Sequence, residues 1–336
     1  VGRKRPAVIL LNEDDLSYAK VRLDAESLAS VSQHLGDFTE SLPRALCWAS
    51  AWDMTRDGEL AARDYLALVL SGITKESDIG MVQSLQRQVK LALDVYADPQ
   101  WRERGLTRWS DETLEQLRAA EPGSDHQLAW ARAFASTART GAQLAVLAGL
   151  LEGTETIEGL AVDTELRWAL LHRLAATGQA GEKEIAAELE RDATSAGERY
   201  AASARAARPT AEAKAEAWAS VVGSGASDAE AGLPNAVQEA VIGGFLQTDQ
   251  RDLLAGYSEK YFEVVKDIWE TRSYEMAQQI AIGLYPALQI SQQTLDATDA
   301  WLESAGPGAA LRRLVTESRA GVERALRAQK ADAAAA

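Results

Sequence analysis

The sequence has few of the residues on which metal, disulfide and nucleophilic chemistry depend. Its 336 residues include one cysteine and three histidines. Cys47 cannot form an internal disulfide, which is typical of a reducing compartment, so we expect a cytoplasmic location. His34, His126 and His172 lie far apart, and no H-E-x-x-H pair places two imidazoles on one helix face. The sequence therefore predicts no metal site and no cofactor in this chain.

Positive charge and long apolar runs are also scarce. The chain has 35 lysines and arginines against 50 aspartates and glutamates, a formal net charge of -15. A surface of this charge repels nucleic-acid phosphates and anionic lipids. No stretch approaches the roughly 20 apolar residues of a membrane-spanning helix, and no secretory leader opens the chain. We expect neither a nucleic-acid partner nor a membrane.

Motifs of other catalytic folds are missing as well. The sequence contains no G-x-S-x-G elbow, no G-x-x-x-x-G-K-[ST] phosphate loop and no G-x-G-x-x-G after a strand. Acidic residues are abundant, but on a helical chain they mostly form solvated faces and pairs with Lys or Arg. We therefore predict no catalytic residues.

The residues that are present favour helices. Alanine, the best helix former, makes up roughly a fifth of the chain, and aromatic residues make up only 6%. Helical periodicity begins at Asp24, and Asp125, Asp163, Thr210 and Ser291 are suited to cap helix starts. The predicted helices lie near 24–35, 42–56, 59–72, 78–97, 111–120, 125–139, 141–151, 163–177, 182–194, 197–207, 210–222, 234–247, 249–271, 273–288, 291–304 and 308–329.

The connections between these helices are short, which predicts antiparallel neighbours. Tryptophans recur along the chain at irregular intervals, so a strict tandem repeat is excluded. We therefore predict an all-α fold, an irregular α-solenoid of antiparallel helix pairs similar to HEAT or armadillo arrays.

The first residues follow a different pattern. Residues 7–23 alternate with period two around a polar turn, which predicts a short β-hairpin before the helices. A lone hairpin is only marginally stable, so its apolar strand needs a partner. The chain also begins at Val1, and a basic lead-in continues to Pro6, which indicates either an internal start in a longer polypeptide or the junction of an engineered segment. The predicted domains are 1–23 as the hairpin, 24–330 as the helical domain with a subdivision near 223–234, and 331–336 as a frayed tail.

Three features have both a structural and a functional interpretation. Arg44 begins a helix that carries two tryptophans, and packing is the simpler role for that helix. Arg167 lies one turn after Asp163 on an amphipathic helix, where the two can form an ion pair. Gly243 and Gly244 interrupt a helical pattern, which is more often retained for close helix packing than for ligand approach.

Several segments together resemble a known family, the aminopeptidase N enzymes, and in particular their actinobacterial branch. The match runs in order through nearly the whole chain. Its segments are 9–24, Pro43 to Trp48, Trp52 to Gly58, Asp163 to Leu174, Arg208-Pro209 with Lys214 and Trp218, Gly243-Gly244-Phe245, and Tyr257 to Trp269.

The resemblance implies a zinc metallopeptidase of four parts: an N-terminal β domain, a thermolysin-like catalytic domain, a small β-sandwich, and a helical solenoid that caps the active site. This chain resembles the last part, and residues 1–23 resemble the end of the β-sandwich. The family's H-E-x-x-H and G-x-M-E-N motifs have no counterpart here. Zinc is therefore expected in the parent protein. The expected partners are the catalytic and β-sandwich domains of the same polypeptide and a peptide substrate.

The favoured function is a non-catalytic C-terminal domain that caps the active-site chamber and controls peptide access, in a parent protein that removes N-terminal amino acids from peptides. Arg44, Arg167, Gly243 and Gly244 are the candidates for facing the peptide or the chamber. Two alternatives remain open. One is an independent α-solenoid scaffold that binds a protein or peptide on its concave face. The other is an all-helical enzyme, which the lack of a D-D-x-x-D cluster disfavours.

Overall fold

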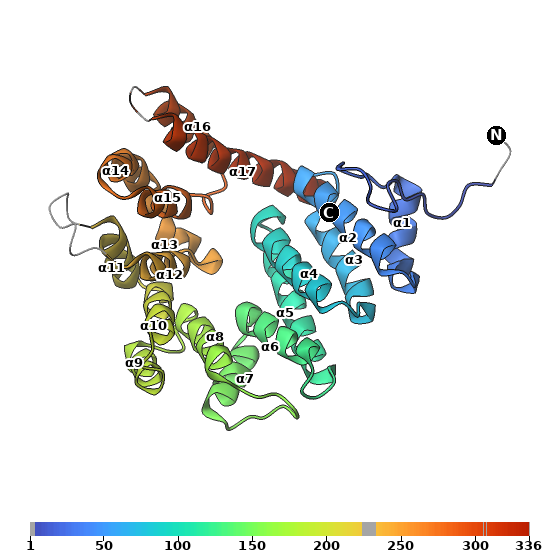
Figure 1. Ribbon diagram of the computed structural model, residues 1–336, viewed down its shortest axis with the longest axis horizontal. Coiled ribbons are helices and arrows are strands. Elements are labelled where there is room, and N and C mark those ends of the chain that lie inside the picture. The colour runs from blue at the N-terminus through green and yellow to red at the C-terminus, as the bar shows by residue number, and fades with distance from the viewer. Residues whose placement is uncertain (1–3, 224–232, 305, 307, 336) are drawn as a thin grey trace. The chain divides into compact units, whose positions relative to one another are not determined.

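The computed structural model describes residues 4–223, 233–304, 306 and 308–335 (Figure 1). All regular structure in these ranges is helical, so the predicted all-α fold is confirmed. The α-helices are α1 (Ala25–His34), α2 (Ser41–Asp57), α3 (Ala62–Gly72), α4 (Ile79–Leu91), α5 (Arg102–Ala119), α6 (Asp125–Thr137), α7 (Gly141–Glu152), α8 (Thr164–Ala176), α9 (Glu182–Arg191), α10 (Ser195–Ala207), α11 (Ala211–Val222), α12 (Asn235–Phe245), α13 (Arg251–Ala255), α14 (Tyr257–Thr271), α15 (Tyr274–Gly283), α16 (Gln292–Glu303) and α17 (Ala309–Ala334).

Short turns of other helix types connect some of these elements. They are the 3₁₀ turns η1 (Leu35–Asp37), η2 (Ile73–Lys75) and η4 (Thr248–Gln250), and the π-helical turn η3 (Ala92–Tyr96). The described helices include none with the length and apolar character needed to cross a lipid bilayer.

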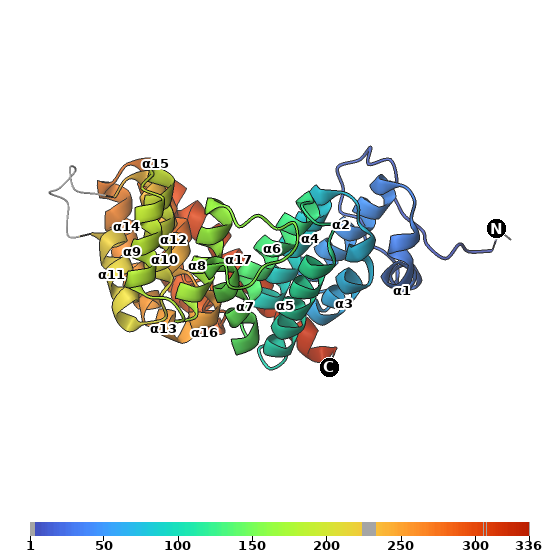
Figure 2. The ribbon, with the colours of Figure 1, turned by 90° about the horizontal axis from the view of Figure 1, so that it is seen from below.

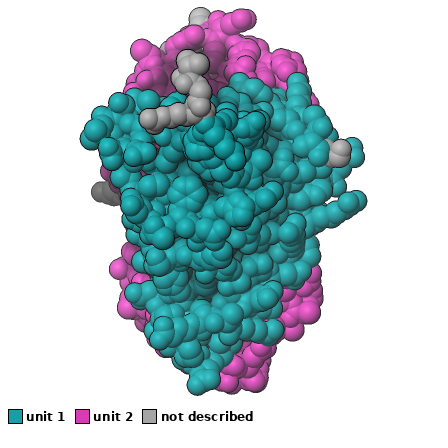
Figure 3. Space-filling model, turned by 90° about the vertical axis from the view of Figure 1, so that its right-hand side faces the viewer, with its two compact units in different colours: residues 1–137, 157–160, 324–336 teal, residues 138–156, 161–323 magenta. Residues whose placement is uncertain are grey.

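The chain forms two compact units, coloured separately in Figure 3. Unit 1 comprises residues 1–137, 157–160 and 324–336, and unit 2 comprises residues 138–156 and 161–323. The subdivision predicted near 223–234 falls mostly on residues 224–232, which lie outside the described residues.

Polar side chains begin many of the helices as the sequence predicts. The side chains of Asp163, Thr210 and Ser291 each accept a hydrogen bond from the free amide three residues on. Asp125 is instead the first residue of α6, and the hydroxyl of Ser124 accepts from the amide of Gln127. The predicted cap is thus displaced by one residue.

In unit 1, α3 packs against α1, α2, α4 and α5, and α5 packs against α6. Large aromatic side chains fill the core between these helices, and Trp48, Tyr65 and Trp109 are almost fully buried. The rings of Trp109 and Trp130 join α5 to α6 with centroids 6.1 Å apart. Burial of such side chains is the main source of stability for helices of this length.

In unit 2, α10 lies beside α12 in both ribbon views and also contacts α8, α9 and α11 (Figures 1 and 2). A small buried cluster forms between α8, α9 and α10, where Trp168 and Ile185 pack on Ala201 and Ala204. The alanines of α10 allow this close approach, because they add little side-chain volume between the helices.

The predicted hairpin is absent: residues 7–23, all within the described part of the chain, contain a turn but no strand. Asn12 and Asp15 have positive φ angles of 58° and 52°, and the Asp15 amide donates to the Asn12 carbonyl. Arg22 pairs instead with Asp57 and Glu59 of the helical body. The segment thus lies against the helical body and does not pair with itself as two strands, because a two-stranded hairpin alone is only marginally stable.

The end of α17 also differs from the expectation. The sequence predicts that residues 331–336 fray, whereas the helix continues to Ala334. Three side chains of this end satisfy backbone groups within unit 1. Arg327 donates to the Asp57 carbonyl at the end of α2, Gln329 donates to the Val95 carbonyl, and Asp332 accepts from the Asp98 amide at 2.8 Å. The contacts of Gln329 and Asp332 pair partly buried polar groups, and with that of Arg327 they hold the last turns in place.

Candidate functional site

Arg44, a candidate from the sequence, lies in α2 of unit 1 and is only 8% exposed. Its guanidinium donates twice to Glu76, at 2.9 and 3.1 Å, and once to the Phe38 carbonyl at 2.7 Å. The Trp48 indole and the Asp78 amide also donate to Glu76. Burial opposes ionisation of Glu76, but these hydrogen bonds outweigh it and lower its pKa. Arg44 is therefore held in a buried, charged network.

Arg167 lies in α8 of unit 2 and is likewise paired. Its guanidinium donates to both carboxylate oxygens of Glu188, at 2.7 and 2.6 Å, and to the Leu151 carbonyl at 2.8 Å. The ion pair expected with Asp163 does not form, because the Asp163 carboxylate accepts from the Leu166 amide at the start of the helix. Arg167 thus joins α7, α8 and α9.

Gly243 and Gly244 are neighbours in α12 with different surroundings. A methyl group on Gly244 would lie 2.1 Å from the Ser203 carbonyl oxygen and 3.0 Å from the Ala206 Cβ. A methyl group on Gly243 would meet nothing within 4 Å. Gly244 therefore permits the close contact of α10 with α12, whereas Gly243 is exposed.

We expect Gly244→Ala to lower the free energy of unfolding by about 1–3 kcal/mol, because the added methyl group forces α10 and α12 apart. Gly243→Ala is the matched control, and we expect it to raise the free energy of unfolding by about 0.5–1 kcal/mol, as for alanine replacing glycine within a helix. Urea unfolding followed by circular dichroism measures both. Equal effects of the two substitutions would contradict the packing role of Gly244.

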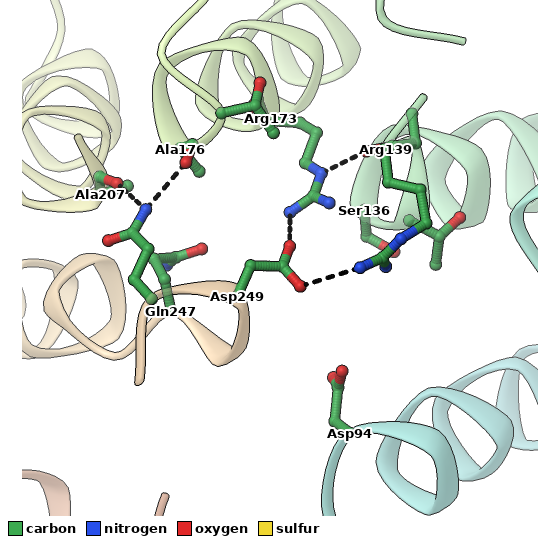
Figure 4. Close-up of polar contacts among 12 residues, drawn as sticks. Asp94, Ser136, Arg139, Arg173, Ala176, Ala207, Gln247 and Asp249 are labelled. Atoms are coloured by element: carbon green, nitrogen blue, oxygen red, sulfur yellow. Dashed lines mark hydrogen bonds and ion pairs between the residues drawn. The ribbon is translucent and has the colours of Figure 1, made fainter. Parts of the chain in front are cut away.

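A cluster of polar side chains gathers in unit 2 around the turn after α12 (Figure 4). We call Arg139, Arg173, Asp249 and Gln250 the Asp249 cluster. The Asp249 carboxylate pairs with Arg173 at 2.8 Å and with Arg139 at 3.4 Å. Arg173 also donates to the Ala138 carbonyl at 2.6 Å. The Asp249 carboxylate thus holds two guanidiniums together.

Gln250 connects this turn to two helix ends. Its amide donates to the Ala176 carbonyl of α8 and to the Ala207 carbonyl of α10, both at 2.8 Å. The last carbonyls of a helix have no partner within the helix. Gln250 satisfies two of them at once, which fixes the turn against both helices.

Lys214 lies near the same helix ends and is fully buried. Its ammonium group donates to the Ala206 carbonyl at 2.8 Å and to the Phe245 carbonyl at 3.0 Å, at the ends of α10 and α12. Burial lowers the pKa of Lys214 from 10.5 to about 8. Burial and the charges of Arg173 and Lys214 lower the pKa of His172 from 6.5 to about 4. His172 is therefore neutral at pH 7.

The cluster's chemistry is electrostatic. Its arginine guanidiniums bind a carboxylate and a carbonyl oxygen, and they remain charged at neutral pH. Among the described residues, no group of three or more His, Cys, Asp or Glu side chains is placed to hold a metal ion.

Sequence reasoning missed the Asp249 cluster and Lys214. A signal existed for Lys214, because it shares one helix face with the buried residues Ala217 and Val221. A lysine at such a position must find acceptors inside the protein. No comparable signal marked Asp249, whose arginine partners lie far away in the sequence.

The sequence matches a known protein family over most of its length. Residues 8–324 match the family described as ERAP1-like C-terminal domain. The match covers most of the chain, and the protein therefore belongs to the ERAP1-like C-terminal domain family.

The chain is also similar to a curated protein from Streptomyces lividans named Aminopeptidase N. The two sequences are 75% identical over all 336 residues of this chain, which spans 38% of the relative's length. The resemblance to the C-terminal helical part of an actinobacterial aminopeptidase N, predicted from the sequence, is confirmed.

Proposed function

We propose that the chain acts as the non-catalytic C-terminal domain of an aminopeptidase N, where it caps the active-site chamber and controls the access of peptides. The observation that carries this proposal is the 75% identity over the whole chain to a much longer protein named Aminopeptidase N. In this proposal the longer polypeptide holds the zinc ion and removes N-terminal residues from peptides in the cytoplasm. The partners of the chain are then the catalytic and β-sandwich parts of that polypeptide.

The polar structure of unit 2 supports such a role. A domain that closes over a chamber has to keep its shape while substrates enter and leave. Gln250 and Lys214 hold the ends of three helices together, and Arg167 ties α8 to α7 and α9.

The four residues nominated from the sequence take different parts in this proposal. In this proposal Gly243, which is exposed and has no side chain, faces the chamber. Gly244 acts through the packing of α12 on α10. Arg44 and Arg167 are paired with Glu76 and Glu188, so they act by positioning their helices.

A chimera tests the proposal. This chain replaces the matching 38% of the Streptomyces lividans protein, and the same protein lacking that region serves for comparison. Hydrolysis of alanyl and leucyl amides is measured beside that of peptides of increasing length. We expect the chimera to retain activity and length selectivity, and we expect the shortened protein to lose the distinction between short and long substrates.

Two results would count against the proposal. Turnover of the amides by this chain alone, with zinc added, would show a reaction centre of its own. An unchanged dependence on peptide length in the shortened protein would mean that the domain does not control access, and specific binding of an unrelated protein would then favour the independent scaffold.

A further inference from the structure

Residues 324–335, the last turns of α17, add little to the apolar core of unit 1. Their buried side chains are those of Ala325, Ala328, Gln329 and Asp332, which lie on one face of the helix. Burial of an alanine contributes little, because it removes only one methyl group from water. In the described part of unit 1, α17 also belongs to none of the closely packed helix pairs, such as α5 with α6. The attachment of this segment therefore depends mainly on polar contacts.

Two side chains of the segment donate to backbone carbonyls of the surface that receives it. Arg327 donates to the Asp57 carbonyl at 3.1 Å, and Gln329 donates to the Val95 carbonyl at 2.8 Å. Asp57 is the last residue of α2 and Val95 lies in η3, so the two carbonyls come from different elements. The segment thus bridges these elements through specific hydrogen bonds.

The carboxylate of Asp332 makes the third contact. It is fully buried, and it accepts from the Arg63 amide at 2.9 Å, from the Arg63 guanidinium at 3.2 Å and from the Asp98 amide at 2.8 Å. Hydrogen bonds to a charged group are roughly twice as strong as those between neutral groups. A carboxylate at this position of a helix is therefore the feature that the receiving surface selects most strongly.

Gly58 shapes the receiving surface where the helix crosses it. A Cβ on Gly58 would lie 3.2 Å from the Arg327 Cγ and 3.4 Å from the Arg327 carbonyl oxygen. The φ angle of Gly58 is 74°, which also favours glycine. The surface thus lacks a side chain at the point where the α17 backbone passes. We call the surface formed by Asp57, Gly58, Arg63, Val95 and Asp98 the α17 docking surface.

We propose that residues 324–335 bind the α17 docking surface as a separable helical ligand. They detach while the core of unit 1 stays folded, and the vacated surface accepts a helix of the same pattern from a separate molecule. That pattern has small residues at positions 325 and 328, a side-chain donor at 329 and a carboxylate at 332.

The division of the contacts supports this proposal. The large, fully buried side chains of unit 1, such as Trp48 and Tyr65, belong to other helices. Segments with few buried apolar contacts open at a lower free energy than the core around them. Polar contacts at fixed positions along a helix also give specificity to a helix that binds a surface. The proposal does not depend on the function proposed for the whole chain.

Thiol labelling of the full chain tests whether the segment detaches by itself. Cys47, the single cysteine, is fully buried in α2 and reports opening of the core. Ala328→Cys adds a thiol to the segment, and Ala129→Cys adds one to α6 at a similarly buried position as a matched control. We expect the thiol introduced at 328 to react with an aromatic disulfide reagent roughly a hundredfold faster than Cys47. The thiol introduced at 129 should react at the rate of Cys47.

Urea separates local detachment from opening of the core. Low urea should leave the fast reaction nearly unchanged, because detachment exposes little surface, whereas the reaction of Cys47 should accelerate steeply. Ala325→Cys repeats the measurement, and it decides the question if Ala328→Cys lowers the melting temperature. The proposal fails if the segment thiol and Cys47 react at one rate with one urea dependence, since the segment would then open only with the core.

A fluorescent peptide of residues 320–335 tests recognition from a separate molecule. It is titrated with the full chain carrying Asp332→Ala, in which the chain's own segment is weakened. We expect a dissociation constant on the order of 10 µM, since the attached segment has an effective concentration on the order of a millimolar. The unaltered chain should bind the peptide roughly tenfold more weakly, because its docking surface is occupied. Gln329→Ala replaces Asp332→Ala in the chain if the latter does not fold.

Two altered peptides provide the controls. Asp332→Ala in the peptide should weaken binding roughly tenfold or more, because the peptide then lacks the carboxylate. Lys330→Ala in the peptide should leave binding unchanged, because Lys330 is exposed. Equal binding of these two peptides, or no binding of the unaltered peptide at about 1 mM, would overturn the proposal.

Discussion

Asp332→Ala is expected to lower the free energy of unfolding by about 3–5 kcal/mol, which is typical when one partner of a buried ion pair is removed. The Asp332 carboxylate is fully buried and accepts from the Arg63 side chain at 3.2 Å and from the Arg63 amide at 2.9 Å. The Asp98 amide also donates to it. Removal leaves two backbone amides without their acceptor, and it leaves the nearly buried Arg63 guanidinium with the more distant Asp98 carboxylate, at 3.9 Å.

The position of this carboxylate adds to the effect. The Arg63 amide belongs to the first turn of α3, whose cap residue Ala61 has no side chain that could accept from it. Asp332 therefore caps α3 from the other end of the sequence, where a negative charge also favours the helix dipole.

An exposed ion pair provides the control for this prediction. Glu182 pairs with Arg205 at 2.7 Å, with about half of the Glu182 side chain exposed. Glu182→Ala is expected to cost less than about 1 kcal/mol, because water screens such pairs. Urea unfolding followed by tryptophan fluorescence measures both variants. If Asp332→Ala costs no more than Glu182→Ala, the last turns of α17 do not hold unit 1 together.

The stability of the chain is also expected to depend on the protonation of Lys214. Its pKa is about 8 in the folded chain against 10.5 ordinarily. Between these pH values the unfolded chain binds more protons than the folded chain, so the free energy of unfolding rises with pH across this window. For a shift of this size the rise is about 3 kcal/mol. Lys214→Met lacks the titrating group and therefore lacks the rise.

The measurement is the difference in unfolding free energy between the unaltered chain and Lys214→Met, taken at intervals from pH 7 to pH 11. Other titrating groups cancel in this difference. We expect the unaltered chain to become more stable relative to Lys214→Met as the pH rises. The difference in unfolding free energy between the unaltered chain and the exposed Lys330→Met should not change with pH. A difference that is constant with pH would mean that the Lys214 ammonium is not penalised by burial.

Local signals predicted the helices because periodicity and turn residues act within short stretches of chain. The prediction near 125–139 agrees with α6, and that near 210–222 agrees with α11. The prediction near 111–120 recovered only the second half of α5. Gly105 weakens the helical pattern before it, yet in the structure this glycine makes room for the Trp101 ring, which a Cβ would approach to 2.4 Å.

The polar contacts could not be predicted in the same way, because their partners are distant in the sequence. Arg173 pairs with Asp249, 76 residues on, and Arg63 pairs with Asp332, 269 residues on. Nothing near either arginine indicates which carboxylate it meets. Arg167 shows the consequence, since its nearby candidate Asp163 is used for capping and its actual partner is Glu188. Local sequence patterns therefore determine where the helices form, whereas tertiary folding determines which charged side chains pair with one another.

The discontinuous make-up of unit 1 has a consequence for the order of events during synthesis on the ribosome. Residues 324–336 belong to the same unit as residues 1–137, and the whole of unit 2 is translated between them. The early helices emerge without the acceptor that completes the start of α3. Unit 2 can therefore fold before unit 1 is complete, because the last turns of α17 join unit 1 only after all of unit 2 has been translated.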